Sequence, residues 1–247
     1  MLTLPSKGLL YPKDHPLSSG KIDVKYMTAK EEDILTSTNL IDKGIVIDRL
    51  LESVIANDKI KINDLLLGDK NALMVGCRVL GYGPEYVVKM TDPDTTLEVE
   101  HKFDLTKLKN VEIDYELLKS GKNEFEFTTP NSNNKLTFKI LTHGDEQNIQ
   151  KELKGYEKLA EATGVSNELT TRLKYQITSV DGDEKQQTIS EFVDNRFLSL
   201  DTRAFRKYVQ QVTPDIDFTQ EYESQIGETH KVDIPIGVRF FWPDSTV

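Results

Sequence analysis

Residues 87–105 read VVKMTDPDTTLEVEHKFDL, and residues 217–236 read DFTQEYESQIGETHKVDIPI. Each stretch has the pattern of a strand, a polar turn and a second strand, and each second strand contains His-Lys-apolar-Asp-apolar. Because side chains alternate between the two faces of a strand, His101 and His230 fall on the apolar faces of their strands in the same register. The repeat predicts two copies of one β-hairpin module.

The second module is predicted to continue to the aromatic residues near the C-terminus, in the sequence IGVRFFWP (236–243). Continued alternation turns Val238 and Phe240 toward the core and Phe241 outward. Together with Trp242, these aromatic residues either close the core or form a surface for a partner, and both alternatives stay open at this point.

A hairpin with a polar turn suggests a zinc ribbon, in which each turn carries a C-x-x-C pair of metal ligands. The turns here read TDPDTT and ESQIGET without a cysteine, and the four histidines show no ligand spacing. We therefore predict metal-free, zinc-ribbon-like modules with no metal ligands and no cofactor. His101 and His230 are interpreted as packed strand residues whose ring nitrogens are satisfied.

Helical segments are predicted on both sides of the first module. TAKEEDIL begins a helix with a capping box formed by Thr28 and Glu31. Apolar periodicity predicts further helices over about 41–56 and 71–80 and several after the first module, the last of them capped by Asp201. EFEFT and KLTFKIL flank a polar turn and predict another hairpin with one buried face.

The first 20 residues contain three prolines, which exclude a helix there. They predict an extended arm whose apolar side chains dock either on their own domain or on a neighbouring protein. These apolar side chains are Leu9, Leu10 and Tyr11.

The predicted fold class is α+β, with helical segments, two metal-free zinc-ribbon-like hairpin modules and an extended N-terminal arm. The chain is expected to form one compact unit or two intimately packed halves. The predicted segments are an extended arm and first strand (1–27), a helical segment (28–85), a β-hairpin module (86–144), a helical segment (145–211) and a C-terminal β-hairpin module (212–247).

Composition narrows the classes of protein. The 247 residues have a net charge of −10, which counts against a general binder of nucleic acids or anionic membranes. The single cysteine, Cys77, cannot form an intramolecular disulfide and fits a reducing compartment. No apolar run is long enough to predict a membrane span, and the first residues lack the pattern of a signal peptide.

No motif for catalysis stands out. The sequence contains no G-x-S-x-G, no P-loop and no H-E-x-x-H, and DGD at 181–183 is typical of a tight turn. Cys77 lies among apolar residues, which predicts a buried, inert thiol. We assign no catalytic residue and predict that the protein is not an enzyme, while an enzyme with an unfamiliar motif stays a distant alternative.

A set of segments in this order resembles the baseplate hub subunits and hub assembly proteins of T-even-type contractile-tailed bacteriophages. The chain departs from many of these relatives at the two hairpin turns, where they carry C-x-x-C pairs and this sequence has DPDT (92–95) and no cysteine in the second turn. The segments are LPSKGLLYP followed by GKIDVKYMTAKEEDIL, then YGPEY before the first hairpin, RLKYQITSVDG, DTRAFRKYV and VDIPIGVRFFWP.

The resemblance implies a late viral protein in the host cell cytoplasm during assembly, which is also a virion component if it is retained in the tail baseplate. It implies a non-enzymatic protein that helps to build the central hub by protein–protein contacts, as a hub component or a chaperone-like assembly factor. Its expected partners are other phage baseplate hub proteins, with no nucleic acid and no membrane span. The alternative function is a nucleic-acid-binding protein built on degenerate zinc ribbons.

Binding hot spots are enriched in large aromatic side chains, so the aromatic residues near the two ends of the chain are the candidate partner-binding residues. The candidates are Phe240, Phe241 and Trp242, followed by Leu9, Leu10 and Tyr11.

Overall fold

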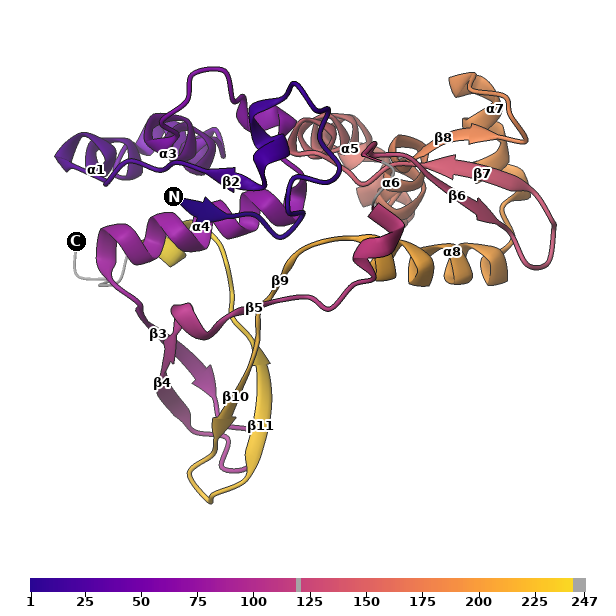
Figure 1. Ribbon diagram of the computed structural model, residues 1–247. Coiled ribbons are helices and arrows are strands. Elements are labelled where there is room, and N and C mark those ends of the chain that lie inside the picture. Colours follow the sequence, from indigo (N-terminus) through magenta and orange to yellow (C-terminus); the bar gives the residue numbers. More distant parts are fainter. Residues whose placement is uncertain (119–120, 242–247) are drawn as a thin grey trace.

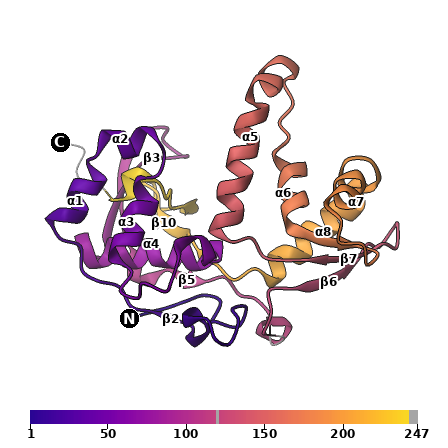
Figure 2. The same ribbon diagram turned by 90° about the horizontal axis from the view of Figure 1, so that it is seen from above.

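The computed structural model describes residues 1–118 and 121–241, except for the side chains of 158–163, 238 and 239 (Figure 1). It contains helices and small antiparallel sheets, which confirms the α+β class. We name three regions: the N-terminal lobe (1–83), the C-terminal lobe (115–212) and the two-hairpin arm (85–104 and 219–233). Figure 2 shows the two lobes on opposite sides of the molecule, with the long helix α5 (His143–Thr163) on the side of the C-terminal lobe that faces the N-terminal lobe.

The N-terminal lobe is helical and begins with a two-stranded sheet. The prediction of an extended first segment without a helix is wrong, because the chain folds back so that β1 pairs with β2, and it forms the short 3₁₀ helix η1 on the way. The predicted capping box is confirmed, because the Glu31 carboxylate accepts from the Thr28 main-chain N–H and the Thr28 side chain caps the helix. The single helix predicted over 41–56 is wrong, because the chain breaks at Gly44 with a left-handed φ of 67°. The elements are β1 (Leu2–Thr3), η1 (Pro16–Ser19), β2 (Lys21–Ile22), α1 (Ala29–Leu35), α2 (Thr38–Asp42), α3 (Val46–Val54), η2 (Ile62–Asp64) and α4 (Leu67–Tyr82).

The two predicted hairpins are confirmed and together form the two-hairpin arm, which projects away from both lobes in Figure 1. β3 (Glu85–Thr91) pairs with β4 (Glu98–Asp104), and β10 (Thr219–Glu223) pairs with β11 (Thr229–Asp233). His101 lies opposite Val88 and His230 lies opposite Tyr222. The likeness of these hairpins to zinc ribbons stays a prediction.

The predicted course of the C-terminal strand is wrong. β11 ends at Asp233, and the chain then forms an irregular segment and the short 3₁₀ helix η6 (Val238–Phe241). Both Phe240 and Phe241 are buried, so Phe241 does not point outward, and their ring centroids lie 5.4 Å apart. The Arg78 guanidinium donates its Nε–H to the Phe240 carbonyl at 2.9 Å and holds this segment on α4. The predicted inward side chain of Val238 lies outside the described residues.

The C-terminal lobe surrounds a three-stranded antiparallel sheet in the order β6–β7–β8. The predicted hairpin is confirmed, and Phe127 and Phe138 pack on Phe205 of α8 with ring centroids 5.5 Å and 5.0 Å away. The elements are η4 (Tyr115–Leu118), β6 (Phe125–Thr128), β7 (Lys135–Phe138), α5 (His143–Thr163), α6 (Glu168–Gln176), β8 (Ile177–Val180), α7 (Gln186–Glu191), the π-helical turn η5 (Phe192–Arg196) and α8 (Ser199–Val212).

Asp201 does not cap α8 as predicted, because the helix begins two residues earlier with Leu198 as its N-cap. The buried Asp201 carboxylate instead accepts four hydrogen bonds from Asn131 and Ser132 in the turn between β6 and β7. Its charge is therefore directed into the lobe and not toward solvent.

Two chain crossings connect the lobes. After η3 (Leu105–Lys107), β5 (Lys109–Asn110) pairs with β9 (Ile216–Asp217) on the return path of the chain. Gly68 of α4 lies directly against this return path, where a Cβ atom would be 2.0 Å from the Pro214 carbonyl oxygen. Only glycine allows so close an approach, so this position fixes the C-terminal segment against the N-terminal lobe.

Candidate interaction surfaces

The N-terminal arm docks on its own lobe through a buried carboxylate, Asp69 of α4. The Tyr11 hydroxyl donates to Asp69 Oδ2 at 2.7 Å and accepts from the Leu66 main-chain N–H at 2.9 Å. The main-chain N–H and the hydroxyl of Ser6 also donate to this carboxylate, at 3.0 Å and 2.7 Å. Burial raises the pKa of Asp69 although these donors act against it, and burial raises the pKa of Tyr11 well above its ordinary value.

The predicted partner-binding residues near the N-terminus are part of this contact. Leu10 and Tyr11 are buried, and Leu9 is half-buried against the same core. The sequence left open whether the N-terminal arm docks on its own domain or on a neighbouring protein, and in the structure it docks on its own domain. A role for these three residues in binding a partner stays a prediction.

The predicted residues near the C-terminus lie elsewhere. Phe240 and Phe241 are buried near the last turns of α4, beside Arg78, whereas Tyr11 contacts the first turn of the same helix. The structure does not bring the two candidate sets together. Trp242 lies outside the described residues, and partner binding by the three aromatic residues stays a prediction.

The turns of the two-hairpin arm are joined by one carboxylate. Asp92 Oδ1 accepts from the main-chain N–H groups of Asp94 and Thr95, and its Oδ2 accepts from the N–H of Gln225 in the other hairpin. Burial acts to raise the pKa of Asp92, but the main-chain donors outweigh it and lower the pKa below the ordinary value. Asp92 thus closes its own turn and attaches the second turn to it.

A row of rings lies between the hairpins. His101 packs on Tyr222 with centroids 4.6 Å apart, and Tyr222 packs on His230 at 5.8 Å. The prediction of packed strand histidines is confirmed, but not that of satisfied nitrogens, because the buried Nε2 of His101 has no partner among the described residues. His230 Nε2 lies 2.8 Å from Asp94 Oδ2 of the other hairpin.

Asp94, Glu228 and His230 are the ligand-type side chains that this packing brings together, with ligand atoms within 4.8 Å of one another. Sequence spacing gave no sign of this cluster, because its members come from both hairpins. Structural zinc sites use four protein ligands. Asp94 and His230 contact each other directly, at 2.8 Å, and the cluster has three members, one fewer than a structural zinc site uses.

A half-buried cluster of polar side chains connects three helices at the junction of the lobes. Asp48 of α3 lies 2.7 Å from Lys70 Nζ of α4 and 2.9 Å from His143 Nε2 of α5, and it also accepts from Gln147. Burial acts to raise the pKa of Asp48, but the hydrogen bonds from His143 and Lys70 hold it far below its ordinary value. The ion pair of Lys70 with Asp48 and the contact of Asp48 with His143 thus connect α3, α4 and α5.

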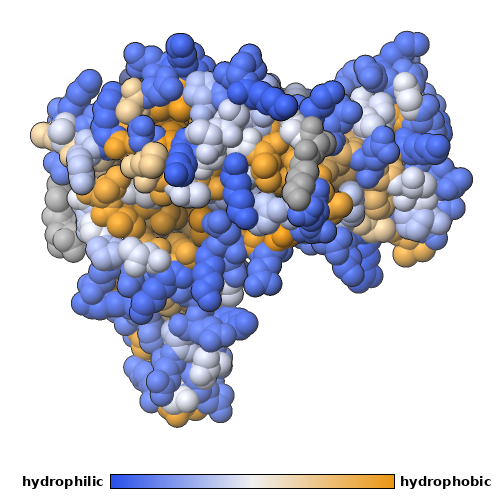
Figure 3. Space-filling model, in the orientation of Figure 1, coloured by the Kyte–Doolittle hydropathy of each residue, from blue (hydrophilic) through white to orange (hydrophobic). Residues whose placement is uncertain are grey.

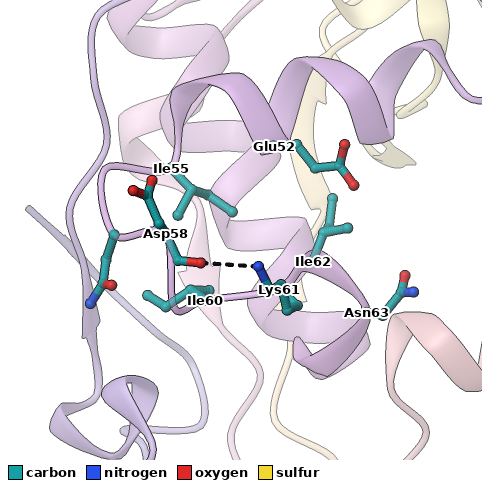
Figure 4. A pocket seen from close by; sticks show the side chains of 8 residues that line it. Glu52, Ile55, Asp58, Ile60, Lys61, Ile62 and Asn63 are labelled. Carbon is teal, nitrogen blue, oxygen red and sulfur yellow. Dashed lines mark hydrogen bonds between the residues drawn. The ribbon is translucent and has the colours of Figure 1, made fainter.

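An open pocket of about 410 Å³ lies between the end of α3 and the loop that precedes α4. Figure 4 shows Ile55, Ile60 and Ile62 around it together with charged side chains, and the Lys61 ammonium donates to the Asp58 carbonyl at 3.1 Å. The polar groups do not converge on one point in the pocket.

The thiol of Cys77, whose pKa burial raises to about 12, is inert in the core, as predicted.

A second, apolar groove of about 330 Å³ runs along α4 between the N-terminal strand β1 and the crossing near β9. Its floor includes Val75 and Val79, and Leu2 packs directly on Gly76, where a Cβ atom would lie 3.1 Å from the leucine. Leu80 is 41% exposed at its edge. Figure 3 shows apolar surface gathered along α4 on this face of the molecule.

Comparison with known proteins places this chain in a family of phage baseplate proteins. The model of the family described as T4 bacteriophage base plate protein matches residues 10–242, which is nearly the whole chain. The chain therefore belongs to this family of phage baseplate proteins. No curated protein and no solved structure shows a significant match. In the described part of the chain, no helix combines the length and the apolar character that crossing a membrane requires.

Proposed function

We propose that this protein helps to build the central hub of the phage tail baseplate by protein–protein contacts and without catalysis. It acts either as a hub component or as a chaperone-like assembly factor, in the host cytoplasm during assembly. Membership in the baseplate family over residues 10–242 supports this proposal. The observation that carries it is the apolar groove along α4, which offers another baseplate hub protein a contact surface.

The groove has the composition of a docking surface. Apolar side chains from α4, β1 and the crossing near β9 line it, and Met1 at its edge is 80% exposed. Large contiguous patches of exposed apolar surface are uncommon on monomeric proteins and typically mark a contact with another molecule. A partner segment with apolar side chains would cover this surface and remove it from water.

Nucleic-acid binding is not proposed. That alternative depended on the two hairpins, and most of the charged side chains in their strands and turns are acidic. An acidic surface repels phosphate groups, so it gives no electrostatic affinity for nucleic acid.

Complementation of a phage that lacks this gene tests the proposal. Leu80→Asp puts a charge into the groove and removes about 1.5 kcal/mol of apolar contact, which lowers the affinity for the partner about tenfold. We expect fewer complete baseplates by electron microscopy and fewer infectious particles. The matched control is Leu169→Asp on α6, where the leucine is 44% exposed on the other lobe.

Normal assembly by Leu80→Asp at the level of the control would refute a role of the groove. Mass spectrometry of purified wild-type particles separately distinguishes the two proposed roles. A hub component is retained in the finished particle, whereas an assembly factor is absent from it. Equal thermal unfolding of the two purified variants confirms that a loss of assembly does not reflect loss of the fold.

A further inference from the structure

We propose that copies of this chain associate head to tail, with the tip of the two-hairpin arm of one copy seated on the exposed side of α8 in the next. The inference goes beyond the proposed function, because it concerns a contact between copies and a different surface from the groove along α4. Two regions of opposite charge, each with exposed apolar side chains, carry it.

The first region is the two-hairpin arm, which concentrates the negative charge of the chain. Residues 85–104 contain six acidic and two basic side chains, and residues 219–233 contain four acidic and one basic, so the arm has a net charge of −7. The whole chain has a net charge of −10. Most of the excess negative charge therefore lies on a projection that Figure 3 shows as largely hydrophilic.

The tip of this acidic arm is apolar. Leu97 is 56% exposed beside the first turn, and Ile226 is 63% exposed in the second turn. The hydrogen bond between Asp92 and the Gln225 N–H holds the two turns together at 3.1 Å. Figure 3 shows hydrophobic surface at the free end of the arm, surrounded by hydrophilic residues. An exposed apolar pair on a rigid projection is suited to insertion into a partner surface.

The second region is the start and the solvent-facing side of α8. Leu198 and Leu200 are 51% and 67% exposed there. Arg203 and Lys207 follow Leu200 at helical spacing, so the three side chains lie on one face, opposite the buried Phe205. The exposed side chains of α8 therefore combine an apolar pair with positive charge.

Few acidic residues accompany this positive charge in the sequence of the helix and its start. From 196 to 212 the chain has four basic residues and a single acid, Asp201, whose buried carboxylate is occupied by Asn131 and Ser132. Arg203, Arg206 and Lys207 form no ion pair with any residue in the described ranges. The basic side chains are free to meet acidic groups from another molecule.

The two regions complement each other but do not meet within one copy. Both ribbon views place the arm and α8 well apart, on different parts of the molecule (Figures 1 and 2). An acidic arm with an apolar tip fits a basic helix with an apolar start, and a second copy supplies that helix. A contact between two different surfaces of identical chains repeats, so it builds rings if it closes and open chains if it does not.

Analytical ultracentrifugation of the full chain tests the proposal. We expect the fraction of associated chains to increase with protein concentration up to about 200 μM. The association should weaken as salt is raised from about 50 mM to about 500 mM, because salt screens exposed charges. Arg203→Glu with Lys207→Glu, and separately Leu97→Ser with Ile226→Ser, each raise the dissociation constant at least about tenfold. Lys151→Glu with Lys154→Glu on α5 is the control, with the same change of net charge.

Mixing the two variants gives the decisive result. The helix variant keeps its arm and the arm variant keeps its helix, so an equal mixture forms one-to-one dimers that cannot grow further. All four substituted side chains are exposed, and thermal unfolding checks that both variants stay folded. A wild-type chain that stays monomeric at low salt, or a mixture without dimers, would overturn the proposal. If the wild-type chain stays monomeric, the partner of the two-hairpin arm would be a different basic protein.

Discussion

The N-terminal arm and the two-hairpin arm are both built around one buried aspartate that accepts three hydrogen bonds. Asp69 accepts from the main chain and hydroxyl of Ser6 and from Tyr11, while Asp92 accepts from three main-chain N–H groups. Both carboxylates are fully removed from solvent contact. They differ in what surrounds them, because Asp69 lies in the core of a lobe and Asp92 in a thin projection.

The surroundings reverse the pKa shift. Burial raises the pKa of Asp69 above 3.8, whereas burial at Asp92 is outweighed by main-chain donors and its pKa falls below 3.8. A raised carboxyl pKa means that stability falls as pH rises from 3.8 through the folded value. A lowered pKa means that stability is present above 3.8 and is lost as pH falls through the folded value. The two arms therefore respond to acid in opposite directions.

Asp69→Ala is expected to have the largest effect. It leaves three donors without an acceptor in the core, so the free energy of unfolding falls by about 3 kcal/mol. Urea unfolding at neutral pH measures the loss, and Asp33→Ala on the exposed side of α1 is the control. The variant also loses the decline in stability with rising pH that the wild type owes to Asp69. A loss below about 1 kcal/mol would show that the carboxylate does not hold the N-terminal arm.

Tyr11→Phe is expected to have an intermediate effect. The ring stays in the core, but Asp69 loses one donor and the Leu66 N–H loses its acceptor. We expect the free energy of unfolding to fall by about 1.5 kcal/mol in the same urea assay. Tyr26→Phe, at a tyrosine that is 73% exposed, is the matched control and leaves stability unchanged. Equal stability of the two variants would contradict the role of the buried hydroxyl.

The sequence could predict the elements that depend on local pattern. The alternation in VVKM and EHKFDL gives β3 and β4, and the pair Thr28 and Glu31 gives the capping box. Both signals are contained in a few neighbouring residues. Contacts between distant residues leave no such signal, and Asp69 is 58 positions from Tyr11. The cluster of Asp48, Lys70 and His143 was not predicted either, because its members also lie far apart in the sequence.

The C-terminal segment shows where local pattern misleads. Apolar residues alternate through IPIGVRFF as in a strand, yet the strand ends before Pro235, which has no N–H for a ladder, and Gly237 follows soon after. The 3₁₀ turn that forms instead buries both Phe240 and Phe241. Two adjacent aromatic residues cannot both face inward in a strand, so the alternation assigned one of them to the wrong side.

Asp92→Ala is expected to have the smallest effect on global stability, which sharpens the difference between the arms. The two-hairpin arm projects from the lobes, so losing its turn contacts opens it locally while the lobes stay folded. We expect amide hydrogen exchange at Asp94, Thr95 and Gln225 to accelerate at least about tenfold. In the wild type the same amides lose protection as pH falls below 3.8, because protonation of Asp92 weakens its acceptance of their hydrogen bonds.

Asp58→Ala, at an exposed aspartate of the N-terminal lobe, is the control. Global unfolding of Asp92→Ala under the conditions that unfold Asp69→Ala would show that the two-hairpin arm is part of the core, and the contrast between the arms would fail.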